Sequence, residues 1–104
     1  MKRNNMKRHN RGETTLQRVH FEFNYPAAES VSIAGTFNDW KPNATPMIDL
    51  GRGRWAKDLT LPPGKYEYCL VVDGEWRPDP QSTETVRNPF GGVNSIRTVA
   101  NGDG

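Results

Sequence analysis

The chain has 104 residues, of which 34% are apolar and 25% are charged, and its formal net charge is +2. This length supports one small domain, because a second core could not bury enough apolar surface. There is no run of roughly 18 apolar residues, so no membrane partner is expected. The one cysteine, Cys69, cannot form an internal disulfide, which favours a cytoplasmic location.

The basic side chains are concentrated at the start of the sequence. Residues 1–12 contain five basic and no acidic side chains, whereas the remainder contains nine basic and twelve acidic ones. We expect a disordered basic tail at 1–12, a folded domain at 13–100 and a frayed C-terminus at 101–104. A flexible solubilising tail is favoured over a segment with a specific anionic partner. No secretory signal is expected, because no hydrophobic segment follows the tail. Nucleic-acid binding is not expected either, because it requires basic and aromatic side chains on one surface.

Alternating apolar residues predict strands in the first half of the chain. A half-buried strand is expected over 15–25 and is ended by Pro26. A second strand at 31–34 leads into the motif Gly35-Thr36-Phe37-Asn38-Asp39-Trp40. Further predictions are a loop at 41–46, a short strand at 47–50, a turn at 51–53 and a strand at 55–61.

The second half continues this pattern. Alternation over 66–72 predicts the clearest strand, and Asp73-Gly74 is the preferred dipeptide of a two-residue hairpin turn. Residues 78–92, which contain three prolines, are expected to form a long irregular loop, and 93–100 to form the last strand. About seven short strands without helical periodicity predict an all-β, immunoglobulin-like antiparallel β-sandwich.

The three tryptophans differ in their predicted surroundings. Trp55 shares a strand face with Leu59 and Leu61 and is expected in the core. A hairpin at Asp73-Gly74 pairs Trp76 with Val71, so that Trp76 points outward. The alternative for Trp76 is that the 78–92 loop covers it and forms a small satellite core with it. For Trp40, a role as a packed anchor of its loop is as well supported as a contact with a ligand. An exposed indole favours a flat, apolar ligand with a polar rim, such as a sugar ring.

Several motifs together resemble one known family. The segments Val31–Trp40, Gly64–Tyr68, Val72–Trp76 and Asp79-Pro80 are similar to carbohydrate-binding module family 48, the isoamylase-type early-set domains. Relatives precede glycogen-branching and debranching enzymes and occur in the beta subunits of AMP-activated protein kinase. The resemblance implies a stand-alone, non-catalytic module that binds α-1,4-glucans such as glycogen or starch. The alternative is a protein-interaction or regulatory module of glycogen- or starch-metabolising enzymes with little sugar binding, and such an enzyme acting in trans is a candidate partner.

The resemblance also implies which residues bind. Trp40 and Trp76 would hold sugar rings, Phe90 would thread the glucan, and Asn94 would hydrogen-bond hydroxyls. Candidate peripheral residues are Cys69, Asn38, Lys41 and Gly92. Kinase subunits carry a lysine at the position of Cys69 and a threonine at that of Gly92, which implies weaker binding or a different glucan here. By the hairpin register, Cys69 is expected at the surface, where a lysine would fold without a burial penalty.

No catalytic, metal or cofactor site is predicted. Glycoside hydrolysis needs two carboxylates that flank the scissile bond. Asp73 and Asp79 are expected to serve turns, and Asp39 to cap its own loop. His20 lies in the middle of a strand without a nucleophile suggested nearby, and neither zinc-ligand spacing nor a phosphate-binding glycine loop is present.

Overall fold

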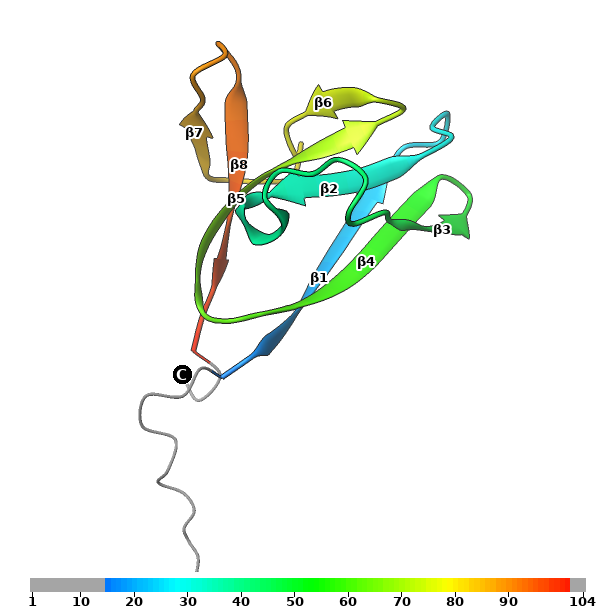
Figure 1. The fold of residues 1–104 in the computed structure, drawn as a ribbon. Coiled ribbons are helices and arrows are strands. Elements are labelled where there is room, and N and C mark those ends of the chain that lie inside the picture. Colours follow the sequence, from blue (N-terminus) through cyan, green and yellow to red (C-terminus); the bar gives the residue numbers. More distant parts are fainter. Residues whose placement is uncertain (1–14, 102–104) are drawn as a thin grey trace, which may run out of the picture.

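The computed structural model describes residues 15–101 of the chain (Figure 1). Within this range the elements are β1 (Gln17–Asn24), β2 (Val31–Gly35), a 3₁₀ turn (Thr36–Asn38), β3 (Ile48–Gly51), β4 (Arg54–Leu61), β5 (Gly64–Val72), β6 (Glu75–Arg77), β7 (Thr85–Arg87) and β8 (Val93–Val99). The expected tail at 1–12 and the last residues, 102–104, lie outside the described residues.

The strands form two antiparallel sheets. One has the order β1-β4-β3, and the other has the order β2-β5-β8-β7, with β6 also paired to β5. The predicted antiparallel β-sandwich is therefore confirmed. The described residues contain eight strands instead of about seven, because Thr85–Arg87 pairs with β8 as β7. The prediction of an irregular loop over 78–92 is wrong at these three residues.

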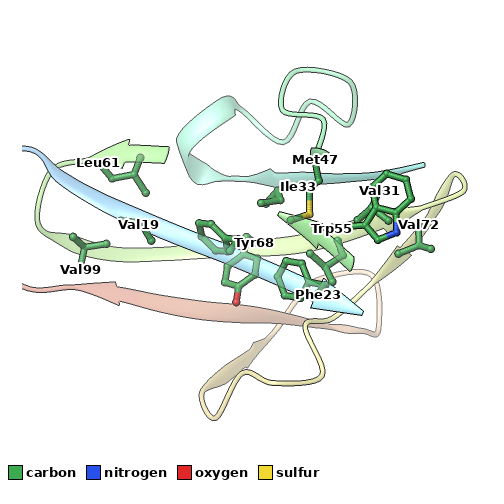
Figure 2. Close-up of a cluster of buried hydrophobic side chains, with 12 residues drawn as sticks. Val19, Phe23, Val31, Ile33, Met47, Trp55, Leu61, Tyr68, Val72 and Val99 are labelled. Carbon is green, nitrogen blue, oxygen red and sulfur yellow. The ribbon is translucent and has the colours of Figure 1, made fainter. Parts of the chain in front are cut away.

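The core lies between the two sheets, and the sequence periodicity explains its composition. In β1, Val19, Phe21 and Phe23 are buried, whereas the alternating polar residues face outward. In β5, Tyr68, Leu70 and Val72 supply the facing apolar layer. Trp55 and Met47 also belong to this buried cluster (Figure 2). No helix within residues 15–101 is long and apolar enough to cross a membrane.

The β5–β6 hairpin has the predicted register. Asp73 and Gly74 form its turn with φ of 50° and 83°, as a two-residue turn with two left-handed residues requires. Val71 pairs with Trp76 and Val72 pairs with Glu75. Trp76 therefore projects from the face opposite the core, as predicted.

The five-stranded sheet divides along one side of β5. The first half of β5 pairs with β8 as far as Tyr68, which is opposite Ser95. The second half pairs with β6 from Leu70, which is opposite Arg77. Cys69 is thus left between the two neighbouring strands. In Figure 1, β6 and the tip of the β7–β8 hairpin lie apart at the same end of the sheet.

Candidate functional site

An open cavity of about 730 Å³ lies beside the division between β6 and β8. It is lined by Trp40, Glu67, Cys69, Trp76, Arg77, Pro78, Asn88, Pro89, Phe90, Gly92, Val93 and Asn94. The fold therefore brings together Trp40, Trp76, Phe90 and Asn94, which are dispersed over 55 positions of the sequence. Two of the peripheral candidates, Cys69 and Gly92, also line this cavity.

Trp76 lines the cavity from β6, and 49% of its surface is exposed. This exposure excludes the alternative that the 78–92 loop covers Trp76 in a satellite core. Residues of the following segment, including Pro78 and Phe90, line the same cavity instead of covering the indole. A large apolar surface is thus left in contact with water beside a concave polar floor.

Trp40 reaches the cavity from a strained loop after β2. Asp39, the C-cap residue of the 3₁₀ turn, and Trp40 both have left-handed backbones, with φ of 57° and 60°. Such conformations in residues other than glycine persist only where the surroundings impose them, and they cluster at binding sites. Here the Trp40 amide donates to the Gly35 carbonyl at 2.9 Å. The indole is half-buried and lines the cavity.

Gly35 and Asn38 hold the base of the Trp40 loop. A side chain at Gly35 would place Cβ 2.5 Å from the Glu67 carbonyl oxygen, so this close approach requires glycine. Asn38 accepts a hydrogen bond from the Gly35 amide at 3.0 Å and donates to the Ile33 carbonyl and the Thr45 hydroxyl, both at 2.9 Å. Asn38 and Lys41 do not line the cavity, so neither predicted peripheral residue is brought to it.

Phe90 lies in the loop between β7 and β8 and is 93% exposed. The preceding sequence explains the turn: Asn88 stands at its first position, Pro89 at its second, and Gly91 has a left-handed backbone with φ of 91°. The Gly91 amide donates to the Asn88 carbonyl at 3.3 Å. The turn carries Phe90 at its third position, outside the hydrophobic core.

Asn94 and Cys69 form the floor of the cavity, and here one prediction is wrong. Cys69 is on the predicted face of β5, but only 6% of it is exposed. Its thiol donates to Oδ1 of Asn94 at 3.3 Å and approaches the Val93 carbonyl at 3.7 Å. Burial raises the pKa of the Cys69 thiol, which favours its neutral form. The hairpin register is right, and the first residues of β8 cover the position that was expected at the surface.

Three polar residues of the cavity, Glu67, Arg77 and Asn88, were not predicted. Glu67 accepts a hydrogen bond from Nδ2 of Asn94 at 3.1 Å. Asn88 donates from its own Nδ2 to Oδ1 of Asn94, also at 3.1 Å. The turn signature Asn-Pro-Phe-Gly could have identified Asn88, because asparagine and proline favour the first two positions of such turns. No local sequence signal indicates Glu67.

The aspartates predicted to serve turns have structural partners. Asp73 accepts hydrogen bonds from the amides of Glu29 and Ser30, both at 2.8 Å, so it also ties the β1–β2 loop to the hairpin. Asp79 is buried and accepts from the Gln81 amide and from the Tyr68 hydroxyl. Burial and this hydrogen bond raise the pKa of Tyr68, which therefore remains a neutral donor.

Sequence comparisons agree with this geometry. Residues 17–103 match the family model described as the glycogen recognition site of AMP-activated protein kinase. The chain is 36% identical over 84 residues to the chloroplastic protein FLOURY ENDOSPERM 6 of Oryza sativa subsp. japonica, covering 81% of this chain and 15% of that protein. It is 33% identical over 75 residues to human 5'-AMP-activated protein kinase subunit beta-2, covering 72% of this chain and 26% of that protein. It is 36% identical over 56 residues to the chloroplastic protein PTST of Arabidopsis thaliana, covering 52% of this chain and 20% of that protein.

These relatives contradict the predicted cytoplasmic location, because the matching proteins of rice and Arabidopsis are chloroplastic. The single cysteine was a poor guide, since a reducing environment is not unique to the cytoplasm. The chain spans about a quarter or less of the length of each of these relatives. The family match covers most of the chain, and the chain therefore belongs to the carbohydrate-binding family of the glycogen recognition site of AMP-activated protein kinase.

Proposed function

We propose that the cavity binds α-1,4-glucans such as glycogen or starch. In this proposal Trp40 and Trp76 stack on sugar rings, Phe90 contacts the glucan from the loop, and Asn94 hydrogen-bonds hydroxyl groups. The observation that carries the proposal is the convergence of three aromatic side chains on one cavity with an amide and a carboxylate at its floor. A pyranose ring matches this arrangement, since it has apolar faces and a rim of hydroxyl groups.

The exposed aromatic surface supplies the driving force. Burial of apolar surface contributes about 25 cal/mol per Å², and Trp76 and Phe90 both leave large areas in water. The Asn94 side chain already bonds Glu67, Asn88 and Cys69, and Arg77 of the cavity lining already bonds Glu75, so few polar groups remain for a glucan. Binding therefore rests mainly on ring contacts, and we expect a dissociation constant between roughly micromolar and millimolar.

The same cavity supports a non-catalytic role. Of the described residues that line it, Glu67 is the only carboxylic acid, whereas glycoside hydrolysis uses a pair. The protein is expected to release no reducing sugar from starch, glycogen or pullulan. Release that co-purifies with the protein and disappears in Glu67→Gln would overturn this conclusion.

The partner proposed for the whole protein is an enzyme of glucan metabolism, either in the same chain or in trans. Such a module would hold the enzyme on its polymer, and the chloroplastic relatives add plastid starch to the glucans worth testing. The alternative is a protein-interaction or regulatory module with little sugar binding. Retention on amylose resin separates the two, because the alternative predicts none.

Calorimetric titration with maltoheptaose tests the site residues. Trp40→Ala, Trp76→Ala and Phe90→Ala should each weaken binding at least fivefold while the far-ultraviolet circular dichroism is unchanged. Ile48→Ala is the matched control, because Ile48 is also exposed but lies on β3 in the other sheet. Equal loss of affinity in all four variants, or unchanged affinity in the three aromatic variants, would contradict the site.

A further inference from the structure

The side chain of Asn88 organises the loop that presents Phe90. Its Oδ1 accepts hydrogen bonds from the backbone amides of Phe90 at 3.0 Å and Gly92 at 3.1 Å. Its backbone amide donates to the Gly92 carbonyl at 2.9 Å. Since Phe90 is 93% exposed and is not part of the hydrophobic core, its place in the cavity wall depends on the backbone of this loop.

The same amide group also sets the orientation of Asn94. Nδ2 of Asn88 and the thiol of Cys69 both donate to Oδ1 of Asn94, at 3.1 and 3.3 Å. Nδ2 of Asn94 donates in turn to Glu67 at 3.1 Å. If Asn94 rotated by 180°, two donors would face its NH₂ group and the Glu67 carboxylate would face its oxygen. The network therefore permits one orientation of this buried amide.

Gly92 lies beside the side chain of Asn88. A Cβ built on Gly92 would lie 3.4 Å from Nδ2 of Asn88 and 3.8 Å from its Oδ1. These are ordinary contact distances, so a Cβ at residue 92 would contact the amide without displacing it. The polar side chain that lies beside residue 92 in this cavity is therefore that of Asn88.

We propose that Asn88 is a positioning residue of the glucan site, which fixes both the loop that carries Phe90 and the orientation of the Asn94 amide. This inference rests on the proposed function and adds to it a residue that determines affinity through its neighbours. The acceptor half of the Asn88 side chain holds the loop, and the donor half orients Asn94. The two halves can be separated by substitution.

The first experiment compares Asn88→Ala and Asn88→Asp by amide hydrogen exchange and by titration with maltoheptaose. Asn88→Ala should speed exchange at the Phe90 and Gly92 amides at least tenfold and weaken binding five- to tenfold. Asn88→Asp keeps the acceptor, so exchange at both amides should stay slow. It loses the donor to Asn94, so affinity should still fall severalfold. Asn24→Ala, at the exposed end of β1 in the other sheet, should change neither measurement.

A double variant tests whether the orientation of Asn94 matters or only the integrity of the network. In Asn88→Asp with Glu67→Gln, Asn94 can bond both neighbours in the rotated orientation, with its NH₂ toward residue 88 and its oxygen toward residue 67. The melting temperature lost in Asn88→Asp should then be regained, while affinity stays low. Recovery of affinity together with stability would overturn the orientation role.

The outcomes also separate this inference from the proposed function. If the unmodified protein takes up no maltoheptaose, the proposed function fails and this inference fails with it. If it binds and both single variants bind equally well, glucan binding stands and the role of Asn88 is refuted.

Discussion

Trp55 in β4 and Trp76 in β6 are the same residue type on strands of different sheets, yet the fold uses them in opposite ways. Trp55 in β4 is paired with Phe23, is 6% exposed, and donates from its indole nitrogen to the Tyr25 carbonyl at 3.3 Å. Trp76 in β6 is 49% exposed at the cavity. The difference follows from the face of the strand that each residue occupies and from what covers that face. The first indole stabilises the sandwich, and the second is available to a ligand.

The largest expected effect is the loss of stability in Trp55→Ala. Removal of a buried indole should lower the free energy of unfolding by about 3–5 kcal/mol, because a cavity remains in a packed core. Trp76→Ala should cost about 1 kcal/mol or less, as is usual for exposed positions. Denaturant unfolding of the two variants measures both values. Equal losses would show that Trp76 is part of the core and that the contrast between the two indoles is wrong.

Cys69→Lys tests a residue that lies between the core and the exposed cavity, because Cys69 is on the outer face of its sheet but is buried. The longer side chain has to displace Asn94 or Val93, so we expect a loss of about 1–3 kcal/mol in stability, in the range of overpacked positions. Cys69→Ser, which keeps the volume and a donor, is the matched control and should change stability less. A lysine variant with unchanged melting temperature would mean that β8 moves aside easily at this point.

The smallest expected effect is on the outer face of the three-stranded sheet, far from both indoles. There Glu22 and then Asp58 hydrogen-bond His20 and raise its pKa above the ordinary value of 6.5. His20, followed by Arg54, lowers the pKa of Glu22 below 4.5. The stabilisation by His20 is complete below pH 6.5 and is lost as the pH rises through its raised pKa. That by Glu22 is lost as the pH falls through its lowered pKa.

This cluster should therefore stabilise the fold most between about pH 4.5 and 6.5. The side chains of these groups are between 37% and 55% exposed, so solvent screening keeps the effect small. The melting temperature of His20→Gln should be lower than that of the unmodified protein in this range and should approach it above the pKa of His20. A difference that is the same at every pH would refute a contribution from protonated His20.

The sequence by itself determined the alternation of the strands, the Asp73-Gly74 turn and therefore the outward side of Trp76. Local geometry is sufficient for these features, because a two-residue turn fixes the pairing of the strands that it joins. The sequence also identified four residues that converge on the cavity. Trp40 and Trp76 were recognisable as tryptophans that follow turn motifs, whereas Phe90 and Asn94 were identified only through the family resemblance.

Only the tertiary structure decided what covers each outward-facing residue. Cys69 and Trp76 share one face of the sheet, yet β8 covers the first and leaves the second exposed. Asn88 and Glu67 hydrogen-bond Asn94, although they are 6 and 27 residues away from it in the chain. Periodicity indicates the side of a strand on which a residue lies, but burial and hydrogen bonding there depend on segments that are distant in the sequence, and these meet only when the sheets assemble.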